Sequence, residues 1–262
     1  MKFNKKILLF SFFGTLGLTA LAQEKSSNTT PPPQQIGGNN DVELLYRNEF
    51  MVGGIIHTSG FGFNYRRGWH VTGYKKRLLE IEVANIKSPK EIKTQNPLFE
   101  NSKGYVYGKL NVLDVLRGGY GYEKILFGKE QRRGVEIKLI SIFGLSLGLA
   151  KPVYLQILQP TTDPQVYNIT TERYDPDKHY IDNIYGRAPF FKGFDQLKVY
   201  PGGYGKLGLS FEYADLDDDI KCIETGITVD AYPKEIPIMA FAKNQQVYVN
   251  LYINFIWGKK WF

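Results

Sequence analysis

Hydrophobic and polar residues alternate with a period of two along most of the chain. The clearest case is residues 247–257, where Val247 and Leu251 fall on one face while Asn250 and Asn254 fall on the other. Successive side chains of a β-strand project to opposite faces, so this pattern predicts a two-faced strand. When tilted, a strand of about 11 residues is long enough to cross a bilayer.

The alternation recurs in seven further segments. In one of them Ile137 and Phe143 are apolar while Glu136 and Lys138 are polar, and the phase continues past Pro152. Together these patterns predict eight strands, over residues 49–58, 60–71, 77–87, 119–128, 134–157, 203–214, 220–232 and 245–257. Residues 105–116 could add a strand, or a short helix in a loop, which leaves ten strands open.

Strand length and loop length decide between two fold classes that share this alternation. A soluble β-sandwich also alternates, but strands of soluble proteins average about five or six residues. The predicted connections alternate in length, with short turns at 72–76, 129–133 and 215–219 and long segments at 88–118, 158–202 and 233–244. Outer-membrane barrels have short periplasmic turns and long extracellular loops. We therefore expect an all-β, antiparallel transmembrane β-barrel, with a periplasmic or secreted β-protein as the alternative.

The N-terminus has the features of a signal peptide. Three lysines in the first six residues precede an apolar stretch at 7–21, and Ala20–Ala22 provides a small-x-small cleavage site. We expect the mature chain to begin at Gln23, with an uncleaved anchor as the alternative. Residues 23–45 are rich in Pro, Ser and Thr and predict a disordered periplasmic lead-in, which leaves 46–262 for the barrel.

Composition excludes several other classes. The 262 residues include one cysteine and three histidines, so neither a disulfide scaffold nor a cysteine-rich metal centre is expected. The mean hydropathy of −0.29 excludes a bundle of transmembrane helices. The net charge falls from +7 to +4 without the three N-terminal lysines, and the basic residues are scattered, so nucleic acid is not an expected partner. No P-loop, dinucleotide fingerprint or HExxH motif indicates a cofactor.

The end of the chain resembles that of bacterial outer-membrane proteins. Such proteins typically end in an alternating strand with a terminal aromatic residue that the barrel-assembly machinery reads, as Val247–Trp257 and Phe262 would provide here. Residues 258–260 interrupt the alternation, so aromatic residues before them are alternative carriers of this signal. The stretches Lys103–Leu116 and Ser146–Tyr154 also resemble a small-barrel family of Bacteroidota, a resemblance that implies no particular activity.

An eight-stranded barrel has a lumen only wide enough for side chains to fill it. Charged residues buried there must pair, because an unpaired charge costs several kcal/mol. The pattern therefore predicts a salt-bridge plug, with a gated ion path or a ligand pocket as the alternative. Acidic residues outnumber basic ones in the predicted set, so some carboxylates would have to be protonated or be paired with Lys124. The set comprises Arg66, Lys138, Lys206, Glu80, Glu82, Glu136, Glu212, Glu224 and Asp230.

Two short motifs are weak candidates for chemistry. His57-Thr58-Ser59 resembles the H-x-S motif of outer-membrane lipid A deacylases, in which His activates Ser for attack on an acyl ester, but no orienting acid can be identified. A turn beside an incidental histidine is the alternative. The acidic run Asp215, Asp217, Asp218 and Asp219 could bind Ca²⁺, although a solvated turn explains it equally. Cys222 is expected to be inert. No catalytic, cofactor or metal residue is assigned.

The long segment 158–202 predicts a helix and an aromatic surface. Asp175 could cap a helix that ends near Gly186, with Tyr180, Ile181, Ile184 and Tyr185 as its apolar stripe. Phe190, Phe191 and Phe194 follow. We expect so aromatic a segment to pack on the barrel mouth or on a partner protein.

These observations favour a non-enzymatic function. We expect an integral outer-membrane barrel that serves as a structural or accessory subunit and docks another outer-membrane protein or a surface lipoprotein through its extracellular loops. A narrow channel or hydrophobic-ligand transporter is the first alternative. A deacylase-like enzyme using His57 and Ser59 is the second.

Overall fold

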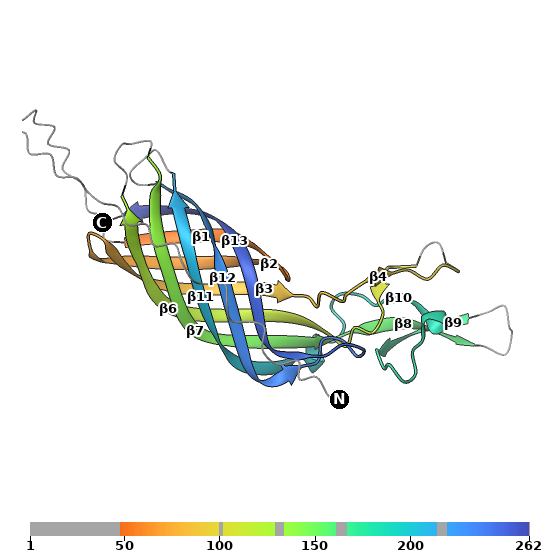
Figure 1. Cartoon of the computed structure of the whole chain (residues 1–262). Helices are drawn as coiled ribbons and strands as arrows, with labels where there is room; N and C mark the ends of the chain where they lie inside the picture. Colours follow the sequence, from red (N-terminus) through yellow and green to blue (C-terminus); the bar gives the residue numbers. More distant parts are fainter. Residues whose placement is uncertain (1–47, 100–101, 129–133, 161–166, 214–218, 262) are drawn as a thin grey trace, which may run out of the picture. The chain divides into compact units, whose positions relative to one another are not determined.

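The computed structural model describes residues 48–99, 102–128, 134–160, 167–213 and 219–261. Eight antiparallel strands close into a barrel in the order β1-β13-β12-β11-β7-β6-β3-β2 (Figure 1). Each strand pairs with its neighbours in the sheet and β1 closes on β13, so no strand edge of the barrel is left open. The strands are β1 (Asn48–His57), β2 (Gly60–Thr72), β3 (Lys75–Ile86), β6 (Asn111–Phe127), β7 (Glu136–Pro152), β11 (Lys198–Glu212), β12 (Asp219–Ile236) and β13 (Gln245–Trp261).

The eight predicted strands all exist, but several of their boundaries differ from prediction. β6 begins at Asn111, so residues 111–116 belong to this strand and the barrel does not gain a ninth or tenth. The predicted strand 134–157 is broken, because β7 ends at Pro152 and its partners end there too. Asn111 of β6 pairs with Pro152, and Lys198 of β11 pairs with Ala150.

The two faces of the barrel wall have opposite character. Phe63, Phe143 and Leu145 point outward and are 68, 69 and 73% exposed, whereas the inward positions carry most of the buried polar residues. A soluble monomer does not expose a continuous apolar belt of this kind, but a barrel in lipid requires one. The chain is therefore an antiparallel transmembrane β-barrel. Within the described residues, no helix is long and apolar enough to cross a membrane.

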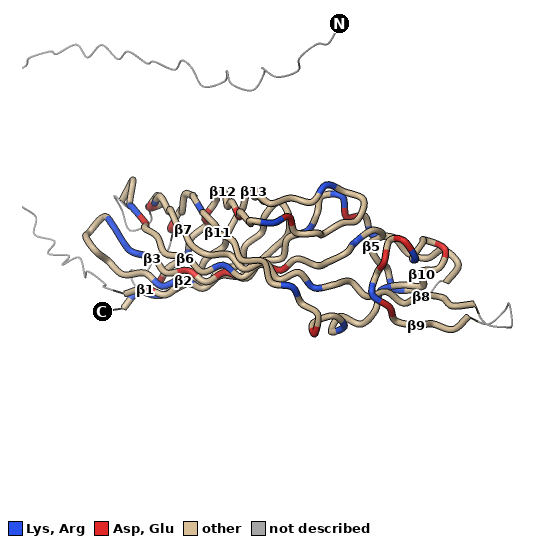
Figure 2. The backbone as a smooth tube through the Cα atoms, turned by 90° about the horizontal axis from the view of Figure 1, so that it is seen from below, with Lys and Arg blue, Asp and Glu red and all other residues tan. Residues whose placement is uncertain are grey.

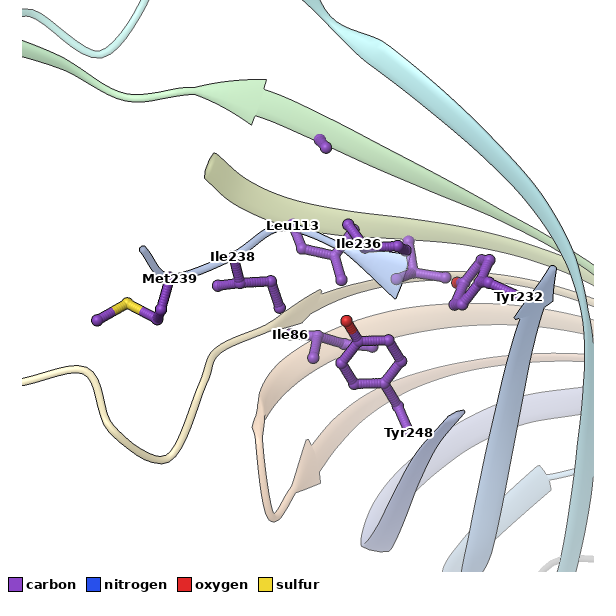
Figure 3. Close-up of a cluster of buried hydrophobic side chains, with 9 residues drawn as sticks. Ile86, Leu113, Tyr232, Ile236, Ile238, Met239 and Tyr248 are labelled. Carbon is purple, nitrogen blue, oxygen red and sulfur yellow. The ribbon is translucent and has the colours of Figure 1, made fainter. Parts of the chain in front are cut away.

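The long connections lie at one end of the barrel, here called the loop end, and both termini of the barrel sheet lie at the other, the turn end. The loop-end segments are 87–110, 153–197 and 237–244, together with the two-residue turn Thr58–Ser59. An apolar cluster of buried side chains lies at the loop end of the barrel (Figure 3). Ile238 and Met239 of the last loop fold onto Ile86, Leu113 and Tyr248, all less than 9% exposed.

A second, smaller sheet stands at the loop end (Figure 1). It contains β8 (Tyr154–Pro160), β9 (Tyr167–Arg173) and β10 (Ile184–Arg187), in the order β10-β8-β9. The short pair β4 (Lys93–Thr94) and β5 (Tyr105–Val106) comes from the preceding loop. We call these two sheets together the loop unit. Its core comprises Tyr105, Leu155, Ile157, Tyr174 and Ile184.

The helix predicted between Asp175 and Gly186 is wrong. The segment contains only a three-residue 3-10 turn, η1 (Ile181–Asn183), followed by β10. Ile184 pairs with Ile157 of β8 and is fully buried, while the backbone at Gly186 packs so closely on Lys103 that a Cβ would lie 2.7 Å from its carbonyl oxygen. Packing across the sheet therefore overrides the local helix signals.

The last strand continues further than the alternation indicated. β13 runs to Trp261, which packs on Phe50 with ring centroids 5.8 Å apart. Lys260 keeps the inward phase and pairs with Glu212, so residues 258–260 do not interrupt the strand. Phe262 lies outside the described residues, as do the predicted leader, its cleavage site and the lead-in.

Candidate functional site

A continuous chain of alternating charges fills the middle of the lumen. Arg66 lies between Glu224, at 2.7 Å, and Glu80, at 2.5 Å. Lys206 joins Glu80, at 2.7 Å, to Glu82, at 2.5 Å. Glu82 also pairs with Arg117, which binds Asp230 at 2.6 Å. The order is thus Glu224, Arg66, Glu80, Lys206, Glu82, Arg117, Asp230, with every side chain at most 1% exposed.

The carboxylates at the two ends of this central chain, Glu224 and Asp230, also accept hydrogen bonds from hydroxyl groups. Tyr252 donates its hydroxyl hydrogen to Glu224 at 2.6 Å. Ser146 donates to Asp230 at 3.0 Å and lies 2.7 Å from the hydroxyl of Tyr232. Each carboxylate of this central chain therefore has at least one cationic partner, and the two at its ends also accept from a hydroxyl.

A second alternating chain lies nearer the turn end. Lys76 contacts Glu49 at 2.7 Å and Glu123 at 3.3 Å, and Lys138 contacts Glu123 at 3.3 Å. Lys138 also pairs with Glu212, which Lys260 binds at 2.7 Å. An apolar cluster that includes Met51, Ile142 and Ile256 is also buried inside the barrel.

The predicted salt-bridge filling is present and contains the three predicted cations Arg66, Lys138 and Lys206, together with further ones. The prediction that Lys124 balances the lumen carboxylates is wrong, because this residue has the outward phase of β6 and is exposed. The additional bases are Arg117, Lys76 and Lys260. By the sequence pattern, Arg117 fell in a predicted long connection, Lys76 in a predicted turn and Lys260 beyond the predicted last strand. Glu136 is only partly buried and lies 3.8 Å from Lys138. Register across the barrel, which no single strand reveals, brings these groups together.

The His57-Ser59 pair is not arranged as base and nucleophile. The backbone N–H of Ser59 donates to Nδ1 of His57 at 3.3 Å, so the imidazole stabilises the turn. Among the described residues, no hydrogen bond joins the Ser59 hydroxyl to the ring. Thr58 donates instead to Asn250 at 3.1 Å.

The other candidates from the sequence give no site in the described residues. Asp215, Asp217 and Asp218 lie outside them, and Asp219 begins β12. In the part of the chain that the structure describes, no group of three His, Cys, Asp or Glu side chains is placed to hold a metal. Cys222 is buried in the apolar cluster near the turn end.

The loop unit joins two loops into one folded body. Asn96 donates to the carbonyl of Ile184 at 2.7 Å, and the N–H of Arg187 donates to the carbonyl of Lys103 at 3.2 Å. Burial raises the pKa of Tyr174 to about 12. The unit is therefore a preformed surface, with a core of its own.

Three phenylalanines form an exposed patch where the loop unit returns to the barrel. Phe190, Phe191 and Phe194 are 68, 82 and 47% exposed, and their ring centroids lie 5.6 to 6.3 Å apart. The ammonium of Lys151, at the end of β7, lies 3.8 Å from the ring centroid of Phe190. Tyr185 is half-buried against Phe99, with centroids 5.2 Å apart, and does not belong to the patch.

No family model and no curated protein matches the chain. Solved structures similar to it include Ail, the attachment invasion locus protein of Yersinia pestis, at 9% identity and a TM-score of 0.40, covering 82% of this chain and 99% of that one. Neisserial surface protein A has the same identity and TM-score and is covered to 97%, against 82% of this chain. The N-terminal β-barrel domain of Pseudomonas aeruginosa OprF is 10% identical, with a TM-score of 0.31 and coverages of 80 and 97%. Likeness at this level says nothing about what the chain binds, and the assignment of the fold rests on its own closed sheet and two-faced strands.

Proposed function

We propose that this protein is a non-enzymatic barrel of the bacterial outer membrane that acts as a structural or accessory subunit. It docks another outer-membrane protein or a surface lipoprotein through the loops at its loop end, which faces the outside of the cell. The observation that carries this proposal is the combination of a filled lumen with a folded loop unit that exposes three phenylalanines.

The filled lumen supports docking over transport. Two chains of paired charges and the apolar cluster at the loop end occupy the space that a solute would need. The arrangement of His57 as a turn acceptor likewise supports a binding role over deacylation.

The phenylalanine patch supports the choice of partner. It lies beside Lys151, a residue on the outward phase of β7, so a neighbour in the same membrane can reach it. Preformed aromatic anchors are the residues that dominate protein interfaces, because they bury large areas at little cost in conformational entropy.

Affinity purification from membranes in mild detergent tests the proposal. The wild-type protein should fractionate with the outer membrane, lack residues 1–22, migrate differently on gels when unboiled, and retain a partner. Alanine at Phe190, Phe191 and Phe194 together should leave the gel behaviour unchanged but release the partner.

Phe241→Ala is the matched control, because Phe241 is 63% exposed on a different loop. It should keep the partner. Recovery of wild type as a lone monomer, or as a soluble periplasmic protein, would contradict the proposal.

A further inference from the structure

A cavity of about 730 Å³ opens where the outer ends of β6 and β7 meet the loop unit. Its wall includes Val112, Lys151 and Tyr154, together with residues from both long loops. This volume lies within the usual range of about 300–1,000 Å³ for small-molecule sites. The cavity is separate from the lumen, and its wall includes Phe190 of the phenylalanine patch.

The wall of this cavity is strongly basic. It contains seven Lys and Arg side chains and one carboxylate, that of Glu91. Figure 2 shows basic positions on the segments around β5, β8 and β10. Lys109 is neutralised, since its ammonium lies 2.5 Å from Glu91. A concave surface lined by charges of one sign concentrates ions of the opposite sign.

Most of the remaining cations have no counter-ion in the described residues. No ion pair there involves five of them, which are Lys87, Lys93, Lys103, Arg187 and Lys192. Lys151 is only 6% exposed and donates to the carbonyl of Phe190 at 2.7 Å. The nearby carboxylate of Asp114 accepts from Asn85 at 2.7 Å. The cavity therefore presents an excess of positive charge that an anionic ligand would satisfy.

The position of the cavity on the barrel wall identifies the source of that anion. Val112 and Lys151 are cross-strand partners on the outward phase, since the adjacent residues Leu113 and Ala150 are fully buried inside. Leu147 and Leu145 precede Lys151 on the same outward phase of β7, toward the turn end, and belong to the apolar belt. At about 3.3 Å per residue, Lys151 lies some 13 Å beyond Leu147 along the strand, at the loop-end border of the apolar belt.

We propose that this cavity binds the phosphate-bearing head group of a glycolipid in the outer leaflet. Arg187 is suited to bidentate contact with a phosphate and the lysines supply point charges, so the cluster can accommodate more than one phosphate. Phe190 and Tyr154 place aromatic rings at the membrane interface, where such rings are favoured. The acyl chains would lie along the outward residues of β7.

Native mass spectrometry of the full-length protein tests this proposal. The protein is refolded in phosphatidylcholine nanodiscs that contain either bis-phosphorylated lipid A or the same lipid after phosphatase treatment, and is then released in mild detergent. The phosphorylated lipid should be retained at least ten-fold more than the dephosphorylated one. Lys103→Gln, Arg187→Gln and Lys192→Gln in one chain should reduce that retention at least ten-fold while preserving the unboiled gel mobility.

A control of equal charge change and a soluble competitor complete the design. Lys178→Gln, Lys234→Gln and Lys243→Gln together remove the same charge away from the cavity and should leave retention unchanged. Equal loss in both triple variants, or equal retention of the two lipids, would overturn the proposal. Tight binding of inositol hexakisphosphate without retained lipid would also overturn it, by assigning the cavity to a soluble anion. The lipid proposal rests on the outward orientation of the loop end in the proposed function, but the assay contains no partner protein, so its failure is distinguishable from a failure of docking.

Discussion

Lys206 is the central link of the charge chain, and its replacement by methionine gives the sharpest test of the lumen. Its ammonium binds Glu80 and Glu82 and is completely buried. Lys206→Met removes one positive charge without changing the volume greatly. Each carboxylate keeps an arginine partner, Arg66 or Arg117, but loses its second cation.

The expected cost follows from the burial of both partners. Removing one member of a buried ion pair typically costs about 3–5 kcal/mol, and because the arginines remain we expect about 3 kcal/mol here. Adding Glu82→Gln removes the unbalanced carboxylate while Arg117 retains Asp230. The double variant should therefore recover about 1–2 kcal/mol, as expected for directly coupled groups.

Urea titration of the refolded protein in lipid vesicles, followed by tryptophan fluorescence, measures these differences. The urea dependence of the unfolding free energy should be unchanged, because the surface exposed on unfolding is the same. A cost below about 1 kcal/mol for Lys206→Met, or a double variant as unstable as the sum of the single ones, would refute the proposed chain of coupled charges.

Three further predictions concern the belt, the wall and the loop unit. Leu251→Arg puts a charge on the lipid face at mid-strand and should destabilise the barrel by about 2–4 kcal/mol in vesicle unfolding, whereas Val247→Arg near the strand end should cost about 0–1 kcal/mol. Gly144→Ala would place a Cβ 2.1 Å from the carbonyl oxygen of Gly118 and should lower the unfolding free energy by about 1–3 kcal/mol. A Cβ at Gly118 meets nothing within 4 Å, so Gly118→Ala should leave the stability unchanged, and urea titration compares the two variants. The phenol of Tyr174 titrates at about 12 in the fold against 10 in the unfolded chain, so the unfolded state ionises first and the loop unit loses stability as the pH rises from 10 to about 12. Melts followed by near-ultraviolet circular dichroism at about pH 9 and about pH 11 should show a smaller drop for Tyr174→Phe than for wild type.

The side of the barrel wall that each strand residue faces could be predicted, because the two-residue alternation of side chains can be followed along one strand alone. Leu209 and Ser210 are neighbours in sequence and face opposite sides in the structure, as the alternation indicates. The partners of the lumen charges could not be predicted in the same way. Arg117 and Asp230 are 113 positions apart, and only the register of the closed sheet brings them within 2.6 Å.

The loop end was the least predictable part for a related reason. Local capping signals favoured a helix after Asp175, but burial of Ile184 against β8 selects a strand. The basic cavity was equally hidden, because its cations come from segments as far apart as Lys87 and Lys192. In the sequence they are scattered, and only the folding of two loops into one unit gathers them.

Single-channel recording of the refolded full-length protein in planar bilayers is the most direct test of a barrel sealed by its own side chains. The two charge chains and the apolar cluster at the loop end predict a current indistinguishable from that of the bare bilayer. Steady, reproducible single-channel currents would contradict the account and favour transport as the function.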